Sequence, residues 1–255
     1  MVANAVLENS ETQNYNDEQI KWLAAFFAEK SYQDRKDETI IYQNEDWVVI
    51  NEFHKNDPKE SGFDGAVYLN KTNGQLVVAF RGTEFTADER GWRDAIKNDV
   101  LGFGYNREPE QYADAKELLN WAVNELNTRN ETKKYCNTYS TDSSQLIITG
   151  HSLGGGLAQL IGAQDAYKQY EVHTFNAIGV AQMVDNLDNK GGFKFSHNYS
   201  NIHNHVISKD FISTIYNHLG EVKVYKPSTN NIMETKNNRI LYLSNNKILV
   251  RSCVN

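Results

Sequence analysis

The sequence predicts an α/β fold with a mostly parallel central sheet, flanked by helices and carrying antiparallel hairpins at its ends. Apolar runs typical of buried strands alternate with helical patterns through the middle of the chain, which indicates parallel strands covered on both faces. An Asn73-Gly74 turn joins two apolar runs, which is typical of a hairpin. A glycine-bracketed turn at 150–154 follows a β-branched run and precedes a helical pattern.

The first half of the chain is expected to begin with a loose polar segment, residues 1–16. Apolar residues at helical spacing then predict an amphipathic helix over 17–30. A second helix is predicted over 110–127, and the polar stretch 127–144 is typical of a surface loop. Three strands are expected between the two helices, over 46–53, 65–70 and 75–82.

In the second half, a strand over 145–150 and a helix over 152–170 flank the glycine turn. The strands that follow are separated by a loop-rich segment containing Gly191-Gly192, and a hairpin around 244–247 is expected near the end of the chain. We expect one domain over residues 1–255, because no repeat or interdomain linker is seen. The remaining strands are predicted over 172–177, 202–208 and 221–226.

The composition is that of a globular protein, with 40% hydrophobic and 23% charged residues among 255. The net charge of −7 argues against a nucleic-acid partner and against simple electrostatic docking on anionic membranes. No apolar run reaches the roughly 18–20 residues that span a bilayer, and no signal-peptide pattern is seen. We therefore expect a soluble protein, cytoplasmic or exported by a route without a cleaved signal. The two cysteines, Cys136 and Cys253, are expected to be reduced thiols.

The glycine-bracketed turn has the pattern Gly-x-Ser-x-Gly around Ser152. A nucleophile held on a sharp strand-to-helix turn needs strained backbone angles and neighbours without side chains, so that a substrate can approach closely. The pattern therefore predicts that Ser152 is a nucleophile. The alternative is a glycine-rich turn whose serine only caps the helix. A phosphate-binding loop is disfavoured because no Gly-Lys-Ser/Thr follows.

A serine nucleophile needs a base to remove its proton and an acid to orient that base. Hydrolases of this architecture place the acid after a late strand, and Asp210 fits that position. Asp185 and Asp188 are weaker candidates, since they are expected in a polar loop. His218 is the candidate base because it is the histidine that follows Asp210, although a purely structural role is the alternative.

The other histidines are weaker candidates for the base. His151 directly precedes Ser152 and is better placed as a structural hydrogen-bonding residue. His203 and His205 lie within the strand that leads to Asp210, and the remaining ones are His54, His173 and His197.

The tetrahedral intermediate of acyl transfer needs hydrogen-bond donors for its negative oxygen. One donor is the backbone N–H after the nucleophile, here that of Leu153. The second is expected from Thr83, because the strand over 75–82 delivers this residue to the sheet edge where the Ser152 turn should also lie. The alternative is a simple turn with a structural Arg81.

Three segments, Val-Val-Ala-Phe-Arg-Gly-Thr at 77–83, Gly-His-Ser-Leu-Gly-Gly at 150–155 and Thr-Phe-Asn-Ala at 174–177, together resemble the class 3 lipase family. This is the group of fungal-type lipases and phospholipases A1, and the resemblance extends over about residues 62–225. It implies an α/β-hydrolase fold, a Ser-Asp-His triad and acyl-ester substrates. It also implies that Thr83 lines the oxyanion hole and that 84–100 is a lid, or else an ordinary surface helix.

The resemblance differs from the family pattern at the histidine. Many class 3 lipases carry a histidine like His218 shortly after the acid, but their catalytic histidine comes later in the chain. No histidine follows His218 here. Either His218 has taken over the role, or the segment bearing the base is missing, or the chemistry is impaired.

We therefore expect a serine esterase or lipase that acts on acyl lipids through an acyl-enzyme, with transient contact at a lipid interface and no metal or cofactor. The alternative is a catalytically impaired protein of the same fold that binds a lipid or a partner. An amidase or peptidase is a weaker third reading, because the fold does not fix the leaving group.

Overall fold

The computed structural model describes residues 15–33, 39–55, 61–82, 110–137, 139, 145–190, 194–208, 210–225, 232–234, 239–244 and 247–252. The predicted loose segment 1–16 lies outside these residues except for its last two, and the predicted lid, Thr83 and Cys253 lie outside them as well. Cys136 is a free, buried thiol.

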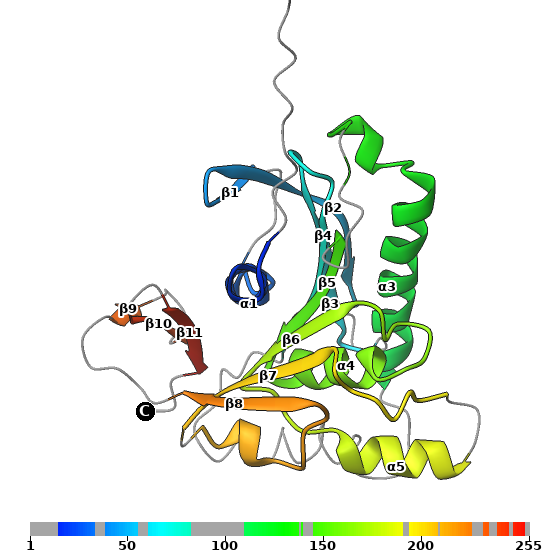
Figure 1. Ribbon diagram of the computed structural model, residues 1–255, viewed down its shortest axis with the longest axis vertical. Coiled ribbons are helices and arrows are strands. Elements are labelled where there is room, and N and C mark those ends of the chain that lie inside the picture. Colours follow the sequence, from blue (N-terminus) through cyan, green and yellow to red (C-terminus); the bar gives the residue numbers. More distant parts are fainter. Residues whose placement is uncertain are drawn as a thin grey trace, which may run out of the picture.

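The central sheet has eight strands, and their order in space follows their order in the chain (Figure 1). The strands from β1 to β4 pair antiparallel, whereas those from β4 to β8 pair parallel. The hairpin predicted at Asn73-Gly74 is confirmed, because β3 and β4 pair antiparallel on either side of it. The strands are β1 (Ile40–Tyr42), β2 (Glu45–His54), β3 (Asp64–Asn70), β4 (Leu76–Phe80), β5 (Leu146–His151), β6 (Glu171–Phe175), β7 (Ile202–Ile207) and β8 (Glu221–Tyr225).

Helices cover both faces of this sheet (Figure 1). Helix α1 (Asp17–Lys30) lies on one face and begins with a capping box, in which the Asn16 side chain accepts from the backbone N–H of Gln19. The helices on the other face are α3 (Glu110–Thr128), α4 (Ser152–Gly162) and α5 (Ala181–Lys190).

The core is divided into two layers by alternation along the central strands. In β4, Val77 and Ala79 pack toward α1, while Leu76, Val78 and Phe80 belong to the cluster with α3 and α4. All five are fully buried. Because successive side chains of a strand point to opposite faces, an uninterrupted apolar run is what a strand covered on both sides requires.

Three predicted elements differ from the structure. Helix α4 ends at Gly162 rather than near residue 170, because the chain turns there and Gln164 pairs with Phe195 in an isolated bridge. The segment 181–190, expected to be loop, is helix α5, so Asp185 and Asp188 lie on a helix. The expected loop 127–144 includes a 3-10 helix, η1 (Thr132–Lys134), in which Thr132 is buried.

The C-terminal hairpin is present but does not extend the main sheet. Strands β10 (Arg239–Ser244) and β11 (Lys247–Ser252) pair antiparallel on either side of residues 245–246, as predicted. With β9 (Ile232–Glu234) they form a separate three-stranded sheet. The hairpin signal is local, but the sheet that a hairpin joins depends on the rest of the fold.

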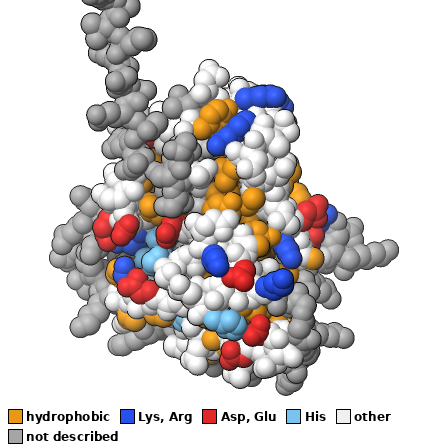
Figure 2. All heavy atoms as spheres, turned by 45° about the vertical axis from the view of Figure 1, so that its right-hand side comes forward, with side chains coloured by type: hydrophobic (Ala, Val, Ile, Leu, Met, Phe, Trp, Pro, Cys, Tyr) orange, Lys and Arg blue, Asp and Glu red, His pale blue; other side chains and the backbone are white. Residues whose placement is uncertain are grey.

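Among the described helices, none combines the length and the apolar character that crossing a bilayer would demand. Acidic and basic side chains are interspersed on the face shown in Figure 2, without a large patch of one sign.

Candidate active site

Ser152 lies at the junction of β5 and α4, at the carboxyl end of a parallel strand. Its backbone φ is 56°, in the left-handed region that residues other than glycine seldom adopt. The residue is 5% exposed, and its hydroxyl makes no hydrogen bond within the described part of the chain. The backbone strain expected of a nucleophile on a sharp turn is therefore present at this serine.

The two glycines of the motif allow the turn to pack closely. A Cβ atom on Gly154 would lie 2.2 Å from the carbonyl oxygen of Phe80, at the end of β4. On Gly150 a Cβ atom would lie 2.5 Å from the backbone of Gly154. Both distances are far below van der Waals contact, so the turn closes only where neither residue has a side chain.

The end of β4 approaches Ser152 directly. A Cβ atom on Gly82 would lie 3.1 Å from the Cβ atom of Ser152 and 2.6 Å from the carbonyl oxygen of His151. The backbone that leads into Thr83 thus lies beside the candidate nucleophile. Leu153 is buried in the first turn of α4, where backbone N–H groups have no partner within the helix.

Tyr32 is a neighbour of this site that sequence reasoning missed. Its hydroxyl lies 3.0 Å from Nδ1 of the buried His151, and it would lie 2.2 Å from a Cβ atom on Gly82. His151 therefore has the structural hydrogen bond expected of it. Tyr32 lies 119 residues before His151, and it belongs to no motif that could have marked it.

Arg81 anchors the end of β4. Its Nη1 donates to Oδ2 of the buried Asp64, at 2.7 Å. The backbone N–H of Arg81 also donates to the carbonyl oxygen of Asp64. These two bonds fix the strand end that brings Gly82 to Ser152.

Asp210 follows β7, with its backbone N–H donating to the carbonyl oxygen of Ile207. Its carboxylate accepts from the backbone N–H of Ser213 at 2.9 Å, and its carbonyl oxygen accepts from the Ser213 hydroxyl at 3.0 Å. Asp210 therefore holds the start of the 3-10 helix η3 (Ile212–Thr214).

His218 lies just beyond η3 and is partly buried. Its Nε2 lies 3.0 Å from the carbonyl oxygen of Ser213, so this nitrogen carries the proton and donates. Its Nδ1 is buried and has no hydrogen-bond partner within the described residues. Burial lowers the pKa of His218, which keeps the imidazole neutral and Nδ1 free to accept a proton.

Backbone bonds connect the loop of His218 with the serine turn. The N–H of Ile178 donates to the carbonyl oxygen of Ser152 at 3.4 Å, and the next residue, Gly179, donates to Ile215. The N–H of Leu219 also donates to Oε1 of Gln159 on α4. The described residues show no hydrogen bond between Ser152 and His218, so the triad of Ser152, Asp210 and His218 stays a prediction.

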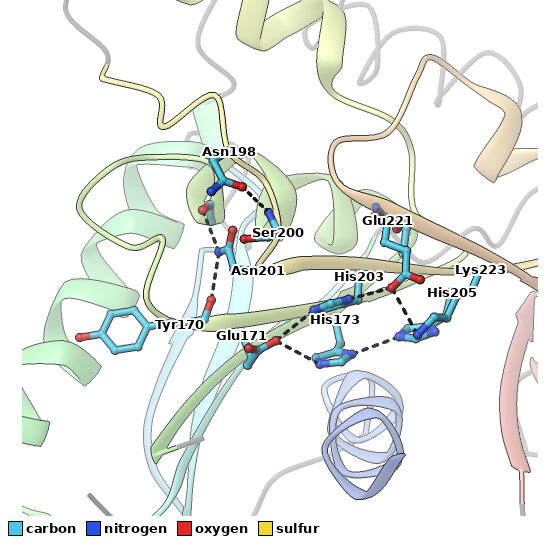
Figure 3. Close-up of polar contacts among 12 residues, drawn as sticks. Tyr170, Glu171, His173, Asn198, Ser200, Asn201, His203, His205, Glu221 and Lys223 are labelled. Atoms are coloured by element: carbon cyan, nitrogen blue, oxygen red, sulfur yellow. Dashed lines mark hydrogen bonds and ion pairs between the residues drawn. The ribbon is translucent and has the colours of Figure 1, made fainter. Parts of the chain in front are cut away.

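The remaining histidines belong to other surroundings. His54 lies near Glu52 and Asp64, and His197 lies near Asp188, each within ion-pair distance. Three others, His173, His203 and His205, gather on the α1 face of β6 and β7 (Figure 3).

The histidines of this group differ in the surroundings that shift their pKa values. Burial lowers the pKa of His205 to about 3, while hydrogen bonds to Glu171 and Glu221 raise the pKa of His203. His203 is thus expected to be charged more readily than His205, although the two lie only two positions apart on β7.

The family comparison gives the decisive observation. The profile of the family described as "Phospholipase-like: Tle-like phospholipase domain" matches residues 24–242, which is most of the chain. The chain belongs to this Tle-like phospholipase family. The resemblance to lipases and phospholipases in the sequence is thereby confirmed, and the mostly parallel sheet with its serine turn after β5 is an α/β-hydrolase fold.

Solved lipase structures show a weaker likeness to this chain. The Lip2 lipase of Yarrowia lipolytica is 16% identical, with a TM-score of 0.49, over 82% of this chain and 79% of that one. A triacylglycerol lipase of Penicillium expansum is 15% identical, with a TM-score of 0.48, over 81% and 78%. No curated protein matches the sequence.

Proposed function

We propose that this member of the Tle-like phospholipase family hydrolyses carboxylic esters of acyl lipids, with Ser152 as the nucleophile. The observation that carries the proposal is the strained backbone of Ser152, with its φ of 56° at the β5–α4 junction. A strained serine at that junction, beside the end of β4, matches the requirements of a nucleophile in this fold. Membership of a phospholipase family favours acyl lipids as the substrate class.

In the proposed mechanism, His218 removes the proton of Ser152 as the hydroxyl oxygen attacks the ester carbonyl. Nδ1 is the accepting atom, since Nε2 donates to the Ser213 carbonyl. Asp210 would act by holding Ser213, which in turn orients the imidazole. We expect the hydrogen bond between Ser152 and His218 to form when substrate binds, because hydrogen bonds of catalytic groups often tighten only in the complex.

The negative oxygen of the intermediate would be stabilised by the backbone N–H groups of Leu153 and Thr83. The protonated His218 then gives its proton to the leaving alcohol, and an acyl chain remains on Ser152. Water attacks this ester with His218 again as the base, which releases the fatty acid and restores the hydroxyl. Such acyl transfer requires no metal or cofactor, and it would bring the protein into transient contact with a lipid interface.

A catalytically impaired protein that binds a lipid or a partner is the second candidate. One observation favours it: the described residues show no hydrogen bond between the Ser152 hydroxyl and an imidazole. A serine without a base keeps its place in the fold but is only a weak nucleophile.

Labelling with a fluorophosphonate separates the two candidates. This reagent reacts with activated serines, so we expect it to label the wild-type chain and not Ser152→Ala. Circular dichroism checks that both proteins are folded. If the folded wild-type chain is not labelled, the impaired protein is the better description. If the wild-type chain is labelled, unlabelled wild-type protein would then be tested on phospholipid vesicles and on triacylglycerol emulsions to identify the preferred ester.

A further inference from the structure

Glutamate and histidine side chains gather at the amino ends of β6, β7 and β8 (Figure 3). Glu171 begins β6, His203 is the second residue of β7 and Glu221 begins β8. His173 lies beside His203 in the strand register. Ser152 follows the carboxyl end of β5, so this cluster lies at the opposite edge of the parallel strands and is not part of the candidate ester-hydrolysing site.

Three of these residues place their ligand atoms around one point. Nε2 of His203 lies 3.1 Å from Oε2 of Glu171, and Nε2 of His173 lies 3.9 Å from the same oxygen. One ligand atom from each of the three residues lies within 4.8 Å of the others. In a tetrahedral zinc site with bonds of 2.0–2.1 Å, ligand atoms are about 3.3 Å apart. Small side-chain movements are enough to bring the three atoms into coordination.

The second nitrogen of each ring already has a partner. Nδ1 of His203 lies 3.2 Å from Oε2 of Glu221, and Nδ1 of His173 lies 3.1 Å from Nε2 of His205. His205 in turn contacts the Tyr225 hydroxyl through its other nitrogen, at 3.0 Å. Histidines that bind metals almost always hold their other nitrogen in this way, which fixes the ring and its tautomer. This orientation leaves both Nε2 atoms directed toward Glu171.

Burial also suits a bound cation. His173 is buried, whereas the side chains of Glu171 and His203 are 30% and 24% exposed, so an ion could enter from solvent. Two nearby cations, Lys21 and Lys223, oppose a metal, since both lower the pKa of His173. Each is paired with another carboxylate: Nζ of Lys21 lies 2.6 Å from Glu18, and Nζ of Lys223 lies 3.3 Å from Glu221.

We propose that Glu171, His173 and His203 form a binding site for Zn²⁺. The bound ion would cross-link β6 and β7. Two imidazoles and one carboxylate leave the fourth tetrahedral position for water. Glu221 is a positioning residue, because it holds the ring of His203. The donor set favours Zn²⁺ over Ca²⁺ and Mg²⁺, which prefer oxygen ligands. The same distances would also suit a protonated His203 held between two carboxylates without metal, and the experiment distinguishes the two.

The test measures zinc binding by the full chain after treatment with EDTA and removal of the chelator. Equilibrium dialysis with ZnCl₂, followed by metal analysis, gives stoichiometry and affinity. We expect one zinc ion per chain and a higher melting temperature, because a ligand that binds the folded state stabilises it. His203→Gln and Glu171→Gln should each weaken binding by at least tenfold, and Glu221→Ala by about tenfold. The matched control is His197→Gln, which changes an exposed histidine that pairs with Asp188.

Three results would overturn the proposal. The first is that the wild-type chain binds no zinc. The second is that the zinc affinity is unchanged in both His203→Gln and Glu171→Gln. The third is that Ca²⁺ or Mg²⁺ raises the melting temperature as much as zinc does. Substitution of the wild-type chain with Co²⁺ gives a readout that does not depend on the folding of any variant. We expect visible absorption typical of tetrahedral cobalt with nitrogen and oxygen ligands, and its absence would equally contradict the site.

Discussion

The two edges of the parallel sheet are built on different principles. At the carboxyl edge, the backbone makes the site: a strained φ at Ser152, and glycines that let β4 and α4 approach it. At the amino edge, side chains make the site, since Glu171, His173 and His203 converge from two strands on one face. The motif around Ser152 is contiguous in sequence, whereas the second arrangement exists only once β6 and β7 pair.

The histidines at the two edges differ in the direction in which their pKa values are shifted. Burial without a carboxylate partner lowers the pKa of His218, while contact with Glu171 and Glu221 raises the pKa of His203. A neutral imidazole can accept a proton as a general base. An imidazole held between two carboxylates is better suited to hold a proton or to bind a metal ion. The surroundings, not the residue type, therefore separate the two proposed roles.

The largest effect is expected for His218→Ala. If His218 is the base, its removal should lower kcat/KM for a soluble ester by about 10²–10⁴-fold, as is typical for the loss of general-base catalysis. The measurement is a kinetic assay with a chromogenic acyl ester. His197→Ala serves as the control and should remain within twofold of the wild type. Activity of His218→Ala close to that of the wild type would show that another group is the base.

Gly154→Ala should be the next most damaging change. The added methyl would lie 2.2 Å from the carbonyl oxygen of Phe80, a backbone atom that cannot move aside. We expect a loss of up to about 3 kcal/mol in the free energy of unfolding, measured in urea, and slower fluorophosphonate labelling. In the comparison variant Gly156→Ala, the methyl meets flexible side-chain atoms of Ile178, so the loss should be smaller. If both variants lose the same unfolding free energy, close packing against β4 is not the reason for a glycine at position 154.

Tyr32→Phe tests the support of the serine turn. The change removes the hydrogen bond between the Tyr32 hydroxyl and Nδ1 of His151, at a cost of about 1 kcal/mol in unfolding free energy. Because this hydroxyl also lies against Gly82, labelling of Ser152 should slow measurably. Full stability and an unchanged labelling rate would show that Tyr32 only fills space.

The pH dependence of stability should report the neutral state of His218. Its pKa in the folded chain lies below the ordinary value of 6.5, so below this pH the unfolded chain binds more protons than the folded one. Its contribution to stability is therefore present above pH 6.5 and is lost as the pH falls through 6.5. Urea unfolding above and below this pH should show a smaller acid loss in His218→Gln than in the wild type. An identical loss in the two proteins would contradict the assignment.

The smallest effect is expected from zinc on the candidate active site. Since the two sites lie at opposite edges of the sheet, saturating zinc should change the rate of fluorophosphonate labelling by less than twofold. A strong change in the labelling rate would show that the edges are coupled.

Much of the fold followed from local signals in the sequence. The boundaries of α1 coincide with the predicted helix 17–30, since the apolar spacing that predicts an amphipathic helix is local to the segment. The hairpin at Asn73-Gly74 and the strand-turn-helix at Ser152 were likewise predicted, because turn residues and apolar runs act over a few positions. Helix α5 was missed because its polar sequence resembles a loop until packing supplies its apolar contacts.

By itself, the sequence determined the alternation of strands and helices, the serine turn and the family resemblance, since each depends on residues close together in the chain. The tertiary structure decided which distant residues meet. It placed Tyr32 against His151, Asp210 against Ser213, and Glu171 against His203. The physical reason is that such contacts depend on strand order and register, which bring together residues up to 119 positions apart and leave no pattern in the local sequence.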